Sequence, residues 1–332
     1  RLLIANTINA AADLGAMAAA LHLLIGGPAK LYVILFGMIT ALLMTFVSYE
    51  KYARFLEWLC LSLFAYVATA FVGNVPWVTV TRELVWPKLA LSHDYVTAVV
   101  AVFGTTISPY LFFWQASQEA ERQQEDPHQQ PLLEAPRQAR GELGRIRFDT
   151  YIGMAFSNII ALSIVITTAA TLHAAGQTNI ETSSQAAEAL RPIAGDFAFA
   201  TFAAGIIGTG MLGAPVLVGS AAFALCGVTK QKAGLACRLR EAPIFYGTIA
   251  ISMIIAIILN TINIDPIRAL FWSAVINGLV AVPVMCLIML LSRDQRVMKT
   301  YRLSGWLTFL GWSATLFMAG LAVAMVASWF IK

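Results

Sequence analysis

The stretch that decides the fold is residues 95–121, which read YVTAVVAVFGTTISPYLFFWQASQEAE. It is apolar and long enough to cross a bilayer, but Pro109 interrupts its centre. Proline lacks the N–H that a helix needs, so the carbonyl of Thr105 loses its helical partner and Ser108 is biased toward an extended conformation. Such backbone is tolerated in a membrane only where it is buried in protein or lines a watery cavity. The stretch therefore predicts a broken spanning helix of the kind that holds ions in secondary transporters. A proline kink without a ligand is the alternative.

The remaining composition predicts an all-α polytopic membrane protein. Of the 332 residues, 59% are hydrophobic and 12% are charged, and the mean hydropathy is +0.73. Nine apolar segments have about the length of a spanning helix, and they cover residues 2–26, 30–49, 54–74, 94–117, 149–173, 194–227, 243–262, 266–291 and 304–331. The sixth is over-long, and its glycines allow a tilt, a break or close helix packing: Gly205, Gly208, Gly210 and Gly213.

Lysine and arginine are concentrated in alternate loops. The loops after the second, fourth, sixth and eighth segments carry most of them, so the positive-inside rule predicts that these loops are cytoplasmic and that the C-terminus lies outside. We expect a multi-pass protein of the plasma (inner) membrane, with one transmembrane domain over residues 1–332. Residues 118–148 are hydrophilic and contain three prolines, which predicts a mobile cytoplasmic linker loop. Residues 174–192 predict an outer loop with a short surface helix.

Polar residues within the first segment form a candidate ion path. Asp13 lies about halfway along this segment, and Asn9 and Asn6 precede it at helical spacing, so the three residues predict one polar stripe. A carboxylate at this depth is costly in lipid and usually faces the bundle interior or a water-filled path, where burial favours its protonated form. The stripe predicts a proton or cation pathway. A hydrogen-bond network that only packs helices is the alternative.

The broken segment offers hard, neutral oxygen donors, namely the Thr105 carbonyl, the hydroxyls of Thr106, Ser108 and Tyr110, and the Gln115 amide. Asn158 lies in the fifth segment, and Asn277 with Gly278 precedes Pro283 in the eighth, a second candidate interruption. Each asparagine taken alone more often holds helices together than binds an ion. The sequence contains no Ser-His-Asp set, Walker loop or HExxH motif, so it favours neither an enzyme nor a nucleic-acid-binding protein.

Three motifs carry a resemblance to a known family. Residues 4–17 read IANTINAAADLGAM, residues 104–115 read GTTISPYLFFWQ, and residues 157–159 read SNI. Over essentially its whole length the chain resembles the Nramp family of divalent-metal transporters. The resemblance implies a LeuT-like fold of two inverted five-helix repeats plus extra spans, in which the nine segments are helices three to eleven of an eleven-helix layout. Helices one and two, with the family's Asp-Pro-Gly-Asn metal-binding break, are expected to precede this N-terminally truncated sequence.

The resemblance also assigns roles to single residues. Ser108 and Tyr110 stand where the family has the methionine and histidine of Met-Pro-His-Asn, and Thr105 supplies the carbonyl that faces the metal. Asp13 matches the family's acidic proton path, although the glutamate one turn on is replaced by Ala16. Gln115 replaces a later histidine, and Asn158 matches the asparagine of helix seven. Together with the second candidate interruption, the predicted metal ligands are Thr105, Ser108, Tyr110 and Asn277. The predicted proton or ion pathway is Asp13, Asn9, Gln115 and Asn158.

Ligand chemistry limits the substrate. A thioether favours softer transition metals, whereas hydroxyl and carbonyl oxygens suit Mg²⁺ or Mn²⁺, and Mg²⁺ prefers sites that keep several waters. Loss of the methionine therefore favours harder or less discriminating selection among Mn²⁺, Fe²⁺ and Mg²⁺, as in the Nramp-related magnesium transporters. Loss of the histidines and the glutamate leaves uniport open beside proton symport.

The predicted function is a membrane-embedded secondary transporter that moves divalent cations inward by alternating access. Its expected partners are the metal ion, the lipid bilayer and, if transport is proton-coupled, protons. No cofactor is expected. Two rivals stay open, namely an amino-acid or other organic-solute carrier of the same fold, and a non-transporting membrane receptor or scaffold.

Overall fold

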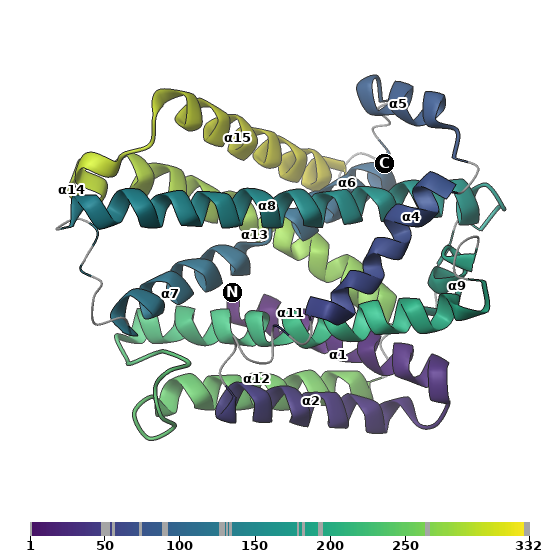
Figure 1. Cartoon of the computed structure of the whole chain (residues 1–332), viewed down its shortest axis with the longest axis horizontal. Helices are drawn as coiled ribbons and strands as arrows, with labels where there is room; N and C mark the ends of the chain where they lie inside the picture. Colours follow the sequence, from purple (N-terminus) through teal and green to yellow (C-terminus); the bar gives the residue numbers. More distant parts are fainter. Residues whose placement is uncertain are drawn as a thin grey trace. The chain divides into compact units, whose positions relative to one another are not determined.

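The computed structural model describes residues 2–47, 54, 57–72, 75–87, 92–125, 130, 132, 135–177, 179–180, 183–191, 195–262 and 266–328. Within these ranges the regular structure is entirely helical (Figure 1). Among the described residues, eight spans are long and apolar enough to cross a membrane. They are α1 (Leu2–Ile25), α2 (Ala29–Phe46), α6 (His93–Thr106) with α7 (Pro109–Glu125), α8 (Pro136–Thr168), α11 (Ala198–Thr229), α12 (Pro243–Thr261), α13 (Pro266–Arg293) and α15 (Gly305–Ser328).

The third predicted segment, residues 54–74, differs from a simple span. Its described part is helical over residues 57–60 and continues through the 3₁₀ turn η1 (Leu61–Leu63) into α4 (Phe64–Val72), and α5 (Trp77–Val85) follows at a sharp bend. The helix over Glu57–Val72 and α5 meet at 106°, so a ninth span exists only if this bent pair is counted as one. The rest of residues 54–74 lies outside the described residues. Short α9 (Ser183–Glu188) confirms a helix within residues 174–192, but it is not a surface helix, because its residues are half-buried or buried and Ala187 joins an apolar core with Leu172 and Phe202.

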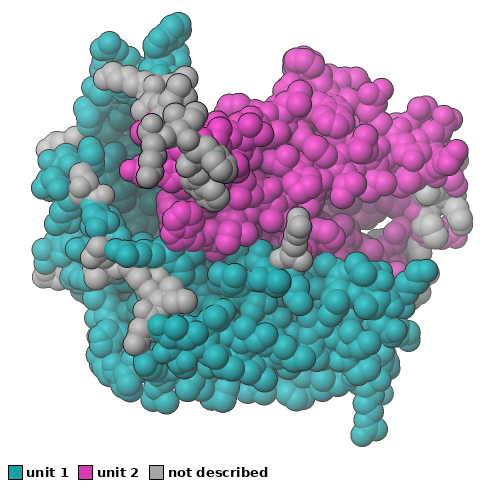
Figure 2. Space-filling model, turned by 180° about the vertical axis from the view of Figure 1, so that it is seen from behind, with its two compact units in different colours: residues 1, 3–88, 151–270 teal, residues 2, 89–150, 271–332 magenta. Residues whose placement is uncertain are grey.

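The chain divides into two compact units, coloured separately in Figure 2. Unit 1 comprises residues 1, 3–88 and 151–270, and unit 2 comprises residues 2, 89–150 and 271–332. Each unit is built from segments that are distant in the sequence. Unit 1 contains the polar stripe of α1 and Asn158, whereas unit 2 contains all four predicted metal ligands and Gln115, so the predicted pathway residues are divided between the two units.

Helix α11 organises unit 1 through its glycines. It packs against α12, α2 and η1 and runs without a break through Pro215. A Cβ added to Gly208 would lie 2.6 Å from the Leu59 Cβ, and one added to Gly210 would lie 2.6 Å from the Met17 Cγ. Only glycine lets the neighbouring helices approach this closely. Of the three outcomes that the glycines allowed, the structure therefore has close packing.

Unit 2 is built around a tight crossing of α6 and α13. A Cβ on Gly104 would lie 2.0 Å from the carbonyl oxygen of Ala274 and 2.6 Å from the backbone nitrogen of Gly278. A Cβ on Gly278 would in turn lie 2.8 Å from the carbonyl oxygen of Val100. Around the crossing, buried residues of α6, α13 and α15 form one apolar core, which consists of Val96, Val100, Ala101, Ala274, Val275 and Met325. The crossing holds the end of α6 in place immediately before the break.

Two sequence predictions about irregular backbone are wrong. Residues 118–148 are not a mobile linker for most of their length, because α7 continues to Glu125 and α8 already begins at Pro136. Residues 126–129, 131 and 133–134 of that stretch lie outside the described residues. The second candidate interruption is also absent, since α13 continues through Asn277, Gly278 and Pro283 to Arg293. A proline removes one hydrogen bond from a helix and introduces one steric clash. Membrane helices tolerate this when packing against neighbouring helices compensates.

Candidate ion site at the broken helix

The predicted break in the spanning helix is confirmed. Helix α6 ends at Thr106 and α7 begins at Pro109, with Ile107 and Ser108 between them. The Ile107 N–H still donates to the carbonyl of Phe103 at 2.8 Å, whereas the first bond of the next helix runs from the Leu111 N–H to the Ser108 carbonyl at 3.1 Å. The backbone therefore leaves the helical path over two residues and resumes it at the proline.

Ser108 closes the break with its own side chain. It is only 2% exposed, and its hydroxyl lies 2.9 Å from the carbonyl oxygen of Gly104 and 3.0 Å from that of Thr105. The prediction of an unpartnered Thr105 carbonyl is therefore wrong, because this hydroxyl replaces the N–H that Pro109 lacks. The hydroxyl proton is engaged, but the serine oxygen and the second lone pairs of both carbonyls are still able to accept or coordinate.

Asn277 lies on α13, the helix that crosses α6 at Gly104, and it carries an unpartnered oxygen among the described residues. It is 5% exposed, and within the described residues its Oδ1 atom is buried without a hydrogen-bond partner. Helical spacing puts Asn277 one turn beyond Ala274, whose carbonyl contacts Gly104 of α6, so it lies on or next to the side of α13 that faces the end of α6. A buried amide oxygen without a donor costs about 1–3 kcal/mol, so an oxygen left in this state is a candidate ligand for a cation.

The other predicted residues of unit 2 are less enclosed. The Thr105 side chain is exposed, and its hydroxyl donates to the carbonyl of Val102 at 2.7 Å, so only its backbone oxygen is directed to the break. Tyr110 is half-buried in the first turn of α7. Gln115 is exposed and donates through Nε2 to the hydroxyl of Thr150 at 3.1 Å, which ties α7 to α8.

In unit 1 the polar stripe of α1 faces α11, as its spacing predicts. Asn6 donates through Nδ2 to the carbonyl of Leu217 at 3.0 Å and to the hydroxyl of Ser220 at 2.9 Å. Two turns further on, a Cβ added to Gly213 would lie 3.2 Å from Oδ2 of Asp13. Among the described residues Asp13 forms no ion pair. Asn6 Oδ1 and Asn9 Nδ2 are both buried and have no hydrogen-bond partner in the part of the chain that the structure describes, so one acceptor and one donor remain open along the stripe.

Asn158 is not enclosed within the described structure. It is exposed on α8, and its Nδ2 atom donates to the carbonyl of Met154 on the same helix at 2.8 Å. The described contacts therefore do not bring it to the stripe. It stays a prediction.

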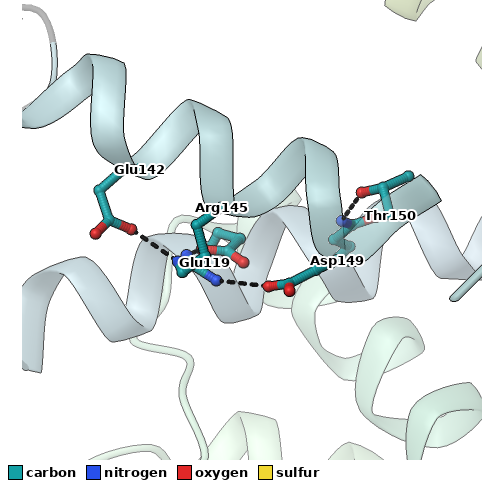
Figure 3. A network of polar contacts seen from close by, with 6 residues as sticks. Glu119, Glu142, Arg145, Asp149 and Thr150 are labelled. Atoms are coloured by element: carbon teal, nitrogen blue, oxygen red, sulfur yellow. Dashed lines mark hydrogen bonds and ion pairs between the residues drawn. The ribbon is translucent and has the colours of Figure 1, made fainter. Parts of the chain in front are cut away.

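A charged cluster that the sequence reading missed joins α7 to α8 (Figure 3). Arg145 lies 2.5 Å from Glu119 of α7, and on its own helix it lies 3.0 Å from Glu142 and 3.1 Å from Asp149. Glu142, Arg145 and Asp149 have the i,i+3 and i,i+4 spacing of ion pairs on a helix. The prediction of an irregular linker over this stretch gave that spacing no helix on which to form the pairs. The cluster explains why these residues are helical, since one guanidinium serves three carboxylates and two helices.

We expect Arg145→Gln to lower the thermal unfolding midpoint. The substitution leaves three carboxylates close together without a cation. The Arg145 side chain is 25% exposed and that of Asp149 is 58% exposed, so after solvent screening the loss costs roughly 1–2 kcal/mol. Arg147→Gln, an exposed change on the same helix, serves as the control and should leave the midpoint nearly unchanged. Equal midpoints for both variants would show that the cluster does not stabilise the α7–α8 pair.

The candidate donors in unit 2 are neutral oxygens. Among the described residues no group of three or more histidine, cysteine, aspartate or glutamate side chains is arranged to hold a metal ion. The candidate donors at the end of α6 and on α13 are instead backbone carbonyls, a hydroxyl and an amide oxygen. Such ligands suit hard divalent cations, which bind through oxygen and retain part of their water shell.

Apolar spanning helices, one of them broken at buried polar groups, define a polytopic helical membrane transporter. Comparison with known families identifies the transporter family to which the chain belongs. The model of the Nramp family, natural resistance-associated macrophage protein-like, matches residues 1–328, so the chain belongs to this family. It is therefore a transporter of divalent metal ions with a LeuT fold, and not an enzyme. No curated protein matches the chain.

Proposed function

We propose that the transported cation binds at the α6–α7 break in unit 2. The ligands are the Thr105 carbonyl, the Ser108 hydroxyl oxygen and Asn277 Oδ1, with Tyr110 beside them in the first turn of α7. The unpartnered Asn277 oxygen supports this proposal most strongly, because it is buried next to the glycine crossing that fixes the end of α6. Its desolvation cost is recovered when a cation or its bound water occupies the site.

The substrate of this site is a hard or borderline divalent cation, namely Mn²⁺, Fe²⁺ or Mg²⁺. The proposed ligands include neither sulfur nor imidazole, which removes the preference for softer metals. Neutral ligands also leave the charge of the ion uncompensated, so a retained water shell and the low number of protein ligands favour weak, reversible binding. Weak binding is what a transporter needs in order to release its cargo.

Transport follows alternating access in the plasma membrane, with uptake toward the cytoplasm. The excess of lysine and arginine in the loops after the second, fourth, sixth and eighth predicted segments supports this orientation, in which the C-terminus lies outside. A broken helix supports the mechanism, because its irregular backbone changes conformation at a lower cost than a continuous helix.

Asp13 and Asn9 form a proton or ion path within unit 1, and the family resemblance adds Gln115 and Asn158 as predicted members. The open donor of Asn9, the open acceptor of Asn6 and the Asp13 carboxylate lie on one side of α1, where water molecules are able to link them. The absence of an ion pair at Asp13 within the described residues supports a protonation role, since a free carboxylate gains and loses protons without breaking a bridge.

Asp13→Asn tests this path. In liposomes loaded with a pH-sensitive dye, we expect metal-driven acidification of the interior to disappear. The amide keeps the shape of the carboxylate but neither binds nor releases a proton. Metal uptake driven by its own gradient should persist at a reduced rate. Acidification that continues unchanged would exclude Asp13 from the proton path, and its absence in the unsubstituted protein would support uniport.

A series of substitutions at Ser108 tests the metal site. Ser108→Met supplies a thioether but removes the hydroxyl that caps two carbonyls, so Ser108→Ala is the matched control for loss of the cap alone. We expect the methionine variant to shift uptake from Mg²⁺ toward Cd²⁺ and Mn²⁺ by roughly tenfold relative to the alanine variant, because sulfur favours softer metals. Identical metal preferences in the two variants would contradict the placement of Ser108 at the ion.

Competition assays separate this function from its rivals. Uptake of a divalent metal that an excess of amino acids does not inhibit supports the metal transporter. Uptake of an amino acid through the same protein would favour the organic-solute carrier. A protein that binds metal but transports neither solute would favour the receptor or scaffold.

A further inference from the structure

Unit 1 contains an apolar groove that the ion site does not use. It lies among α1, α11 and α12 and has a volume of about 390 Å³. Its walls include Ile4, Ile8, Leu225, Ile251, Ile255 and Leu259. The volume lies in the range of about 300–1,000 Å³ that is typical of ligand sites.

The hydroxyl groups in the wall do not make this groove polar. Thr7 donates to the carbonyl of Leu3 at 2.8 Å, and Thr248 donates to the carbonyl of Ile244 at 2.7 Å, so these two hydroxyls are satisfied by their own helices. The third hydroxyl residue of the wall, Ser252, is only 2% exposed. A cavity with such walls does not hold water well. Because the helices that form it span the membrane, the apolar material that reaches it is the hydrocarbon of a lipid.

The groove lies close to a cluster of exposed positive charges. The loop between α11 and α12 carries one acidic residue, Glu241, and four exposed basic residues, which are Lys230, Lys232, Arg238 and Arg240. Leu225 precedes the end of α11 by four residues, and Thr248 follows the start of α12 by five. Measured along the two helix axes, the near end of the groove is therefore roughly 6–8 Å from this loop.

We propose that the groove and the basic loop together bind an anionic phospholipid. An acyl chain occupies the groove among α1, α11 and α12, and the phosphate is held by the four basic side chains. Such a lipid needs an apolar surface for its acyl chain and positive charge for its phosphate. Here α11 and α12 line the apolar groove, and the loop that joins them carries the positive charge. Basic residues at a membrane surface attract anionic lipid, whereas a zwitterionic lipid offers them no net charge. The site lies within unit 1 and does not depend on the ion site.

The acyl-chain contact is tested by filling the groove. Ile251 lines the groove and is 61% exposed, so Ile251→Trp occupies the space without disturbing the core. Ile254→Trp is the matched control, because Ile254 is 56% exposed on the same helix but does not line the groove. The purified, delipidated protein is titrated with phosphatidylglycerol in detergent and analysed by native mass spectrometry. We expect the Ile251 variant to bind at least about tenfold less lipid at a given concentration, and the Ile254 variant to match the unsubstituted protein.

The headgroup contact is tested by neutralising the loop. Lys230, Lys232, Arg238 and Arg240 are replaced together by glutamine, and a control variant carries the same change at Arg293, Arg296, Lys299 and Arg302 of unit 2. We expect phosphatidylglycerol binding to fall roughly tenfold or more in the first variant only, and phosphatidylcholine binding to be weak in all proteins. Equal binding of the two lipids, equal effects of the two neutralised loops, or unchanged binding by Ile251→Trp would each overturn the proposal. Each variant is accepted only if it is monodisperse and unfolds at the temperature of the unsubstituted protein.

Discussion

Metal uptake is expected to be almost abolished when Gly104 is replaced with alanine. The new methyl group would lie 2.0 Å from the Ala274 carbonyl oxygen and 2.6 Å from the Gly278 nitrogen. Both are backbone atoms, so no side-chain rotation relieves the clash, and α6 and α13 must separate. Overpacking of this kind costs about 1–3 kcal/mol, and this site belongs at the upper end of that range. The strain lowers the unfolding midpoint, and because it displaces the end of α6 that carries the proposed ligands, the ion-bound state bears it too. At roughly 1.4 kcal/mol per factor of ten, about 3 kcal/mol of strain in the bound state corresponds to a loss of metal affinity on the order of 100-fold.

The matched control for this variant is Gly320→Ala. Gly320 lies in α15 of the same unit, and a Cβ added there meets no atom within 4 Å. Alanine in an open helical position should be neutral or slightly stabilising, because it restricts the unfolded chain more than glycine does. Uptake of ⁵⁴Mn²⁺ into proteoliposomes and the unfolding midpoint are measured for both variants. A Gly104→Ala protein that transports normally would show that the α6–α13 crossing does not position the ion ligands.

Asn277→Leu is expected to separate transport from stability. Loss of a ligand oxygen should weaken metal binding by about 10- to 100-fold, which is the loss of affinity typical when a residue that supports a metal ligand is replaced. The unfolding midpoint should stay the same or rise, because leucine removes a buried oxygen without a partner, whose burial costs about 1–3 kcal/mol. Isothermal titration with Mn²⁺ and thermal unfolding in the absence of metal measure the two effects on the same sample.

Asn6→Leu provides the contrast. Asn6 is fully buried like Asn277, but its Nδ2 atom bonds the Leu217 carbonyl and the Ser220 hydroxyl across two helices. Its replacement should therefore lower the unfolding midpoint and leave Mn²⁺ binding at the break intact. If Asn277→Leu instead destabilises the protein while Mn²⁺ binding is unchanged, Asn277 is a packing residue and not a ligand.

Features that depend on nearby residues could be predicted well from the sequence. Pro109 alone determined where the spanning helix breaks, because the lost N–H and the ring clash act within four residues. The spacing of Asn6, Asn9 and Asp13 predicted which residues share a face of α1, since 3.6 residues complete a turn. The same local rules failed over residues 118–148, where the prolines indicated a linker. Arg145 supports the helices there through Glu119, which is distant in the sequence.

For the candidate site too, local sequence rules predicted some features and contacts between distant residues decided the others. Residue type and position indicated Thr105, Ser108, Tyr110 and Asn277 as metal ligands, and the family resemblance assigned the first three their roles. The sequence alone established a membrane protein with a break at Pro109, because hydropathy and proline geometry are properties of short stretches. Only the tertiary structure decided that Ser108 caps the Thr105 carbonyl and that, among the described residues, Asn277 on the crossing helix α13 is left with an open oxygen. These two facts depend on which atoms approach across the Gly104–Gly278 crossing, and contacts between helices some 170 residues apart follow from packing in three dimensions and not from local propensity.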